Sequence, residues 1–249
     1  MAKPTASSRA AGLQFLYRYL TLALPIVLLL VGSLFAYRHL SQPGSLPLRV
    51  VEVTGEFTHL DHAALEKQVA GAIDGGFFDV DLQRIRSQVS AMPWVEQVSV
   101  RRVWPDTLRM HVSEQVPLAY WNKEALVNLK GEVFRPEKVP SLGSLPYLFG
   151  EDRGAPQVVA FYLQLQTLAL QESLRVDSVR LNPRGEWSVA FRDGLELILG
   201  REDIAHRQRA FIDVYPSLVG NMQRRPERID MRYEHGFAVR WREQADGES

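Results

Sequence analysis

His59 and His62 flank Asp61 near the start of an expected helix, and this combination of residues could hold a metal ion. Histidine nitrogens and carboxylate oxygens are common zinc ligands, but a stable site needs a third or fourth ligand. The sequence marks no further ligand at a fixed spacing. A polar cap on the first turn of the helix explains the same residues, and we favour that interpretation.

Asp79 and Asp81 could pair for acid–base catalysis, but their place before another expected helix favours capping. His111 lies in an expected strand and His206 on an exposed helix face, and neither has a marked serine or carboxylate partner. The basic pair Arg101-Arg102 is typical of a solvated surface, although it could also meet an acidic partner or lipid headgroups. The sequence therefore predicts no enzyme, no catalytic residue, no metal and no cofactor.

Composition narrows the function classes further. The chain of 249 residues has no cysteine, which excludes disulfides, thiolate nucleophiles and cysteine-based zinc sites. Twenty-nine basic and 29 acidic side chains balance to zero net charge, so there is no overall basic field to attract nucleic acid. No nucleotide-binding or other small-molecule motif is apparent. We expect neither nucleic acid nor a small-molecule substrate.

An apolar segment near the start predicts a membrane anchor. Residues 20–37 read LTLALPIVLLLVGSLFAY, about 18 residues without a charge, and tyrosines lie at both ends. A cleaved signal peptide or a buried helix are the alternatives, but the segment is long and no small-x-small cleavage site follows. We expect a cytoplasmic tail over 1–18, a single transmembrane helix over 19–40 and a linker over 41–47. The slight excess of positive charge before the helix favours a cytoplasmic N-terminus, with the bulk in the periplasm.

The segment from 48 to 116 predicts a small α+β domain. Alternating β-branched residues over 48–54 indicate a strand, and apolar residues at helical spacing follow in two helices, the second capped by Asp81. Two further strands are expected over 95–103 and 107–112, joined at Trp104-Pro105-Asp106. The resulting order is β-α-α-β-β, with both helices on one face of the sheet.

A second α+β domain is expected from 117 to 242, followed by a flexible tail over 243–249. Its strands are expected to form an antiparallel sheet that has helices over 156–174 and 202–218, the latter frayed or ended near Pro216. An irregular connection is expected over 136–156. Strands over 228–233 and 237–241 finish the chain, and the last of them is expected at an open sheet edge because only a tail follows it.

Several segments of the sequence resemble those of a known family. The sequence PWVEQVSVRRVWPDTL, followed by SEQVPLAYWN, resembles the POTRA domain and its exit in the FtsQ/DivIB family of bacterial cell division proteins. GGFFDVDLQRIR before Pro93 and IDMRYEHGFAVRW near the end fit the same family, and the similarity spans nearly the whole chain. It implies an inner-membrane scaffold at the division septum that links early and late division proteins.

The resemblance also implies partners and a binding site. In the family, the final strand of the β-domain binds FtsB by strand addition, and through FtsB it holds FtsL; FtsK, FtsW, FtsI and FtsN are further expected partners. Matching the motif places Tyr233 as the main anchor, Trp241 as the closing aromatic residue and Arg232 as a salt-bridging group, with Arg184 as a less secure basic contact. The remaining expected contacts are His235, Gly236, Phe237, Val239 and Arg240.

Two other functions stay open from the residues alone. POTRA modules also occur in secretion and outer-membrane assembly factors, although no barrel-length series of strands follows here. An anchored periplasmic hydrolase would need a deep pocket that holds titratable groups with perturbed pKa values.

Overall fold

The structure is a computed structural model that describes residues 23–35, 38, 48–220, 225–234 and 236–242. The expected tail 1–18, linker 41–47 and C-terminal tail 243–249 lie outside the described residues, as do both ends of the expected anchor. Residues 23–35 are helical and exposed. Within the described ranges, no helix combines the length and the hydropathy that crossing a bilayer requires.

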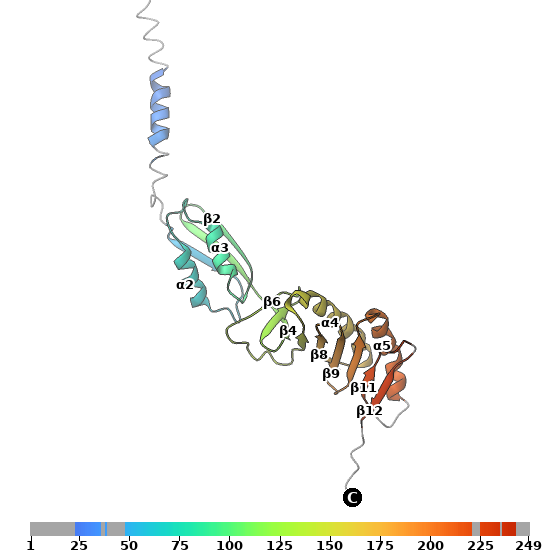
Figure 1. Cartoon of the computed structure of the whole chain (residues 1–249). Coiled ribbons are helices and arrows are strands. Elements are labelled where there is room, and N and C mark those ends of the chain that lie inside the picture. Colours follow the sequence, from blue (N-terminus) through green and yellow to red (C-terminus); the bar gives the residue numbers. More distant parts are fainter. Residues whose placement is uncertain (1–22, 36–37, 39–47, 221–224, 235, 243–249) are drawn as a thin grey trace, which may run out of the picture. The chain divides into compact units, whose positions relative to one another are not determined.

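The chain divides into two compact units, the first ending at Ser113 and the second beginning at Glu114. The first unit contains a three-stranded sheet and two helices, in the expected order β-α-α-β-β (Figure 1). Its elements are β1 (Val50–Thr54), α2 (His62–Ala72), α3 (Leu82–Ser90), β2 (Val95–Val103) and β3 (Thr107–Glu114). The sheet order is β1-β3-β2, with β1 parallel to β3, so that the helices cross over one face.

Side-chain caps begin both helices of the first unit. Asp81 accepts hydrogen bonds from the backbone N–H groups of Gln83 (2.9 Å) and Arg84 (3.1 Å), as the sequence predicts. Asp61 does the same for Ala63 at 2.9 Å, which confirms a polar cap at the start of α2. The ring of His59 stacks on Trp94, with centroids 4.4 Å apart. No group of three or more potential metal ligands occurs within the described ranges.

Apolar side chains of both helices pack on the sheet of the first unit. Leu65 and Ile85, from α2 and α3, are fully buried against Leu108 and Met110 of β3. The guanidinium of Arg102 reaches back from β2 and donates to the carbonyl groups of the loop between the helices, at 2.6 Å for Val80. Arg102 therefore fixes this loop and is not a free surface charge.

The second unit has a nine-stranded sheet with two long helices (Figure 1). Its strands are β4 (Pro117–Trp121), β5 (Ala125–Asn128), β6 (Val133–Phe134), β7 (Tyr147–Phe149), β8 (Val176–Leu181), β9 (Trp187–Phe191), β10 (Glu196–Gly200), β11 (Pro226–Asp230) and β12 (Ala238–Trp241). Its helices are α4 (Ala155–Ala169) and α5 (Ile204–Gly220), with single turns η1 (Asp152–Gly154) and η2 (Leu170–Glu172). The sheet order is β12-β11-β10-β9-β8-β7-β4-β5-β6.

The expectation of an antiparallel sheet is wrong for three pairs of strands. β7 is parallel to β8, and β10 is parallel to β11. In each case a helix, α4 or α5, returns the chain to the end of the sheet at which the preceding strand began, so the next strand runs in the same direction. β4 is also parallel to β7. The sheet is therefore mixed, and only its hairpins are antiparallel.

Three local expectations are also wrong. β7 lies inside the stretch expected to be irregular, and it occupies a central place in the sheet between β4 and β8. Helix α5 continues through Pro216 to Gly220, and Leu218 beyond the proline packs against the core. Strand β11 ends at Asp230 and not at Tyr233, because the chain turns there.

Both helices cover one face of the large sheet and form its core. From α4, Val158 and Leu165 are fully buried, and from α5 Phe211 is fully buried. Phe211 lies against Phe191 of β9, with ring centroids 5.6 Å apart. Alternate residues of β9 and β10 are buried in this core. The packed core therefore fixes the position of the strands next to the sheet edge.

A hydrogen bond from a fully buried indole yields a stability prediction. Trp121 donates to Asp152 at 2.8 Å, and this bond, followed by one from Arg135, holds the pKa of Asp152 below its usual 3.8. Asp152→Ala leaves the indole N–H unpaired and is expected to lower the free energy of unfolding by about 1–3 kcal/mol in urea denaturation. Because the folded-state pKa of Asp152 is depressed, this contribution is present above about pH 4 and is lost as pH falls through the folded pKa.

Glu151→Ala is the matched control, because among the described residues the side chain of Glu151 forms an ion pair with Arg153 alone, and the side chain of Arg153 is 86% exposed. It is expected to change the free energy of unfolding by less than about 1 kcal/mol. Equal effects of the two substitutions would contradict a special role for the Trp121 bond.

Candidate functional site: the β12 edge

Strand β12 forms one edge of the nine-stranded sheet. It pairs antiparallel with β11, with Ile229 opposite Val239 and Asp230 opposite Ala238. In the part of the chain that the structure describes, no strand lies on its other side. An edge strand presents backbone N–H and C=O groups that another extended chain can pair with. The open edge expected from the sequence is therefore present within the described residues.

The side chains of β12 alternate between the two faces of the sheet. Val239 is half-buried and packs against the core, and Trp241 is half-buried at the end of the strand. Ala238 and Arg240 are exposed, and Arg240 forms a two-bond ion pair with Glu227 of β11, both distances being 3.0 Å. Val239 thus serves the core of its own unit, whereas the exposed positions remain accessible to a partner.

Tyr233 and Phe237 lie at the opposite end of β12 from Trp241, in the turn that leads into the strand. Tyr233 is 59% exposed and Phe237 is 38% exposed, although large aromatic side chains usually bury most of their surface. A side chain added at Gly236 would meet open space. His235 lies outside the described residues. The exposed aromatic groups are thus placed at the strand's entrance.

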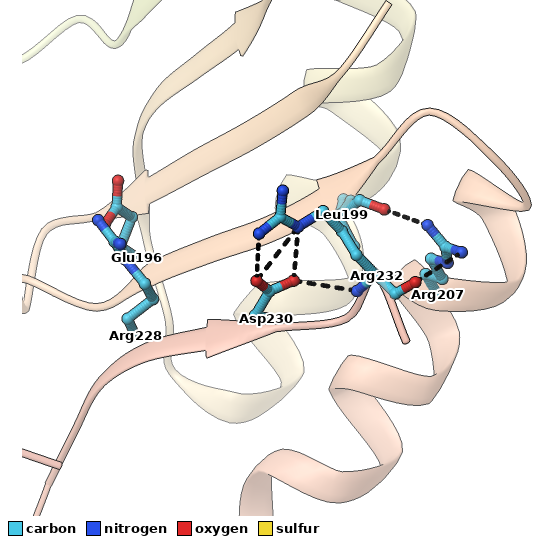
Figure 2. Close-up of polar contacts among 6 residues, drawn as sticks. All are labelled: Glu196, Leu199, Arg207, Arg228, Asp230 and Arg232. Carbon is cyan, nitrogen blue, oxygen red and sulfur yellow. Dashed lines mark hydrogen bonds and ion pairs between the residues drawn. The ribbon is translucent and has the colours of Figure 1, made fainter. Parts of the chain in front are cut away.

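Arg232 lies in the same turn and is held by Asp230 (Figure 2). Its guanidinium donates to both carboxylate oxygens, at 2.7 Å from Nη2 to Oδ2 and 2.9 Å from Nε to Oδ1, and its backbone N–H donates at 3.1 Å. These bonds lower the pKa of Asp230 and raise that of Arg232. The side chain of Asp230 is only 15% exposed, whereas that of Arg232 is 54% exposed, so the arginine remains accessible on one side.

Arg207 of α5 also contacts the same turn, a role that the sequence did not reveal (Figure 2). Its guanidinium donates to the carbonyl of Leu199 at 2.6 Å and to that of Arg232 at 3.5 Å. Gly200, with a positive φ of 75°, makes room for both arginines, because an added Cβ would lie 3.0 Å from each. The end of β10 and the start of the turn are therefore joined through one helix side chain.

Arg184, in the turn between β8 and β9, lies close to Arg232 and Arg207. It lines a small cavity together with Arg232, Arg207 and Gly200. The structure therefore brings together the two basic residues that the family motif singles out. Nearby, Arg228 of β11 pairs with Glu196 of β10, the residue that lies opposite it in the register of these two strands (Figure 2).

The chemistry of this region suits the binding of a polypeptide. It combines an open backbone edge, exposed aromatic side chains and arginines whose charges are only partly compensated. Such a combination fits an extended polypeptide that carries acidic side chains, since backbone bonds provide affinity and the flanking groups provide specificity.

The Asp230–Arg232 pair can be tested by pH titration. Arg232→Ala is expected to raise the pKa of Asp230 towards its ordinary value of 3.8, as measured by NMR of the carboxyl carbon. In the parent chain, the folded-state pKa is depressed, so the pair stabilises the fold above about pH 4 and weakens as the pH falls through that pKa. Arg240→Ala, which removes a charge paired elsewhere, should leave this pKa close to its parent value; an equal rise in both variants would refute the pairing.

Comparisons with known proteins give a family match for each of the two units. The family described as "Cell division protein FtsQ/DivIB, C-terminal" matches residues 119–232, and the family "POTRA domain, FtsQ-type" matches residues 46–115. A "Cell division protein FtsQ" of Coxiella burnetii is 34% identical over 82% of this chain and 84% of its own length. One of Shewanella oneidensis is 34% identical over 88% and 84%, respectively.

A solved structure is also similar. The major extracytoplasmic domain of the division protein DivIB from Geobacillus stearothermophilus aligns with 45% of this chain and 99% of its own, at 17% identity and a TM-score of 0.29.

Proposed function

The chain belongs to the FtsQ/DivIB family of cell division proteins, and we propose that its second unit captures FtsB by adding a strand of that partner to β12. The open edge of β12 carries this proposal, because it leaves one row of backbone groups without a partner strand in the described residues. Tyr233 and Phe237 flank the entrance of the strand and Trp241 its end. An added strand would therefore be clamped by aromatic groups at both ends.

Electrostatics supports the same site. Arg184 and Arg232 line one cavity beside the turn, and the Arg232 guanidinium is half-exposed although it is paired with Asp230. A partner carboxylate could share Arg232 with Asp230, because a guanidinium has five N–H donors and Asp230 uses only part of them. Acidic residues on the partner strand would fix its register.

The rest of the proposed role concerns the whole chain. Residues 19–40 would hold the protein in the inner membrane, with the bulk in the periplasm, and the first unit would meet early partners such as FtsK. Binding of FtsB would bring FtsL, and FtsW, FtsI and FtsN would join the same assembly. Confinement to one membrane and several modest contacts give tight assembly without any single strong contact. No catalytic step is part of this role.

Capture of FtsB should depend on the aromatic groups at both ends of β12. Tyr233→Ala and Trp241→Ala are each expected to weaken binding of FtsB by about tenfold or more in a pull-down with the full chain in detergent. The circular dichroism of both variants should match that of the parent, because Tyr233 is exposed and Trp241 lies at the sheet edge.

Trp104→Ala is the matched control, because Trp104 is 76% exposed but belongs to the first unit. It should bind FtsB as the parent does. Parent-like capture by both the Tyr233 and the Trp241 variants would rule out β12 as the binding edge.

The anchor has a separate test. The full chain should stay with the membrane pellet after alkaline carbonate extraction, because the uncharged segment of about 18 residues would be buried in hydrocarbon. A chain that lacks residues 19–40 should move to the supernatant. If the two chains fractionate alike, the anchor is placed wrongly.

A further inference from the structure

A second cavity lies at the far end of the β11–β12 hairpin, away from the turn that carries Tyr233. It has a volume of about 430 Å³. Four arginines line it, against two carboxylates: Arg175, Arg192, Arg225, Arg242, Glu172 and Asp193. Neither the family motif nor the proposed strand addition assigns any role to this cavity.

Two of the arginines hold the walls of the cavity in place. Arg242 donates from Nη2 to the backbone carbonyl of Asp193 at 3.1 Å, and Arg192 donates to the carbonyl of Ser144. Gly194 permits this approach, because an added Cβ would lie only 2.8 Å from Nη2 of Arg242. The β9–β10 turn is thus fastened to the residue that follows β12.

The other two arginines are not used in this way. Arg175 and Arg225 are both exposed, and no described carboxylate forms an ion pair with either guanidinium. Elsewhere in the same unit the arginines at the sheet edge are paired, as in Arg240–Glu227 and Arg228–Glu196. The cavity therefore holds basic groups that have hydrogen-bond capacity left for an external acid.

The cavity lies at the Trp241 end of the proposed binding edge. The backbone N–H of Arg242 donates to the carbonyl of Arg225 at 3.0 Å, which extends the β11–β12 ladder by one pair beyond Trp241. A strand added to β12 would run about 4.8 Å from it. Chain that continues past Trp241 would consequently arrive beside Arg242 and the mouth of the cavity.

We propose that this cavity binds acidic side chains on the partner segment that continues past the Trp241 end of β12. The inference rests on the proposed strand addition, and it names the chemistry of the segment that flanks the added strand. Carboxylates fit because guanidinium groups bind them through paired N–H donors. The Arg184–Arg232 cavity lies at the other end of the strand, so the partner would carry acidic residues on both sides of the added strand.

Charge reversal at the two unpaired arginines tests the inference. Arg175→Glu and Arg225→Glu in the full chain, reconstituted in nanodiscs, are each expected to weaken binding of the periplasmic region of FtsB by about tenfold at about 50 mM salt. The loss should shrink to about twofold at about 500 mM salt, because screening weakens exposed charge pairs. Arg209→Glu is the matched control, since Arg209 is an exposed arginine on α5 that does not line the cavity. It should bind within about twofold of the parent.

The outcomes separate this inference from the proposed function. Parent-like binding by both cavity variants, or a loss of equal size in Arg209→Glu, would overturn the acid-binding cavity even if Tyr233→Ala abolishes capture. Parent-like binding by both Tyr233→Ala and Trp241→Ala would instead overturn the strand addition, and the cavity inference, which rests on it, would fall with it. Arg175→Gln and Arg225→Gln, which remove charge without reversing it, replace any glutamate variant whose circular dichroism differs from that of the parent.

Discussion

The parallel pairing of β10 with β11 is the constraint on which the open edge of the sheet depends. Helix α5 carries the chain from the end of β10 back across the face of the sheet, so β11 must run in the same direction. Ile229 of β11 then lies opposite Leu197 of β10, and both are fully buried under the helices. The hairpin that follows has room only on the outer side of β11, which is why β12 becomes the edge. A shift of one residue in the β10–β11 register would turn the core side chains outward and move the whole hairpin.

Much of the fold could be predicted from the sequence where local chemistry decides it. The β-α-α-β-β order of the first unit followed from alternating and helical patterns, and Asp81 could be identified as a cap because it directly precedes an amphipathic run. The strands on both sides of Asp193-Gly194 were recognisable from the turn between them. In these segments, neighbouring residues contain all the information that the element needs.

The errors arose where distant parts of the chain decide the structure. β7 has only three residues, Tyr147–Phe149, which is too short to show alternation, and it is a strand because β4 and β8 pair with it from both sides. The direction of a strand within a sheet is likewise a property of the connections, so the antiparallel expectation failed at the helix crossovers. Helix α5 was expected to fray or end near Pro216, but packing of the next turn against the core keeps the helix intact.

The candidate site shows the same division. Tyr233 and Trp241 came from the resemblance to a family. The spacing of Asp230 and Arg232 in the sequence contains the signal for the bond from the Arg232 backbone N–H to Asp230, since an aspartate commonly bonds to the backbone two residues later. Arg207 could not have been found in this way. It is 25 residues from Arg232 along the chain, and only the packing of α5 brings its guanidinium to the turn.

The shortness of β12 determines what kind of contact its edge can make. The strand has four residues, Ala238–Trp241, and only alternate residues of an edge strand direct their N–H and C=O groups outward. A bound polypeptide can thus gain only a few main-chain hydrogen bonds there, each with a net value of about 1 kcal/mol. The lifetime of such a complex would then depend on the side chains at the two ends of the strand. Loss of the side-chain contacts at either end would shorten that lifetime sharply. A contact of the proposed kind could be separated without unfolding either protein, which would suit an assembly that forms and disperses in every round of division.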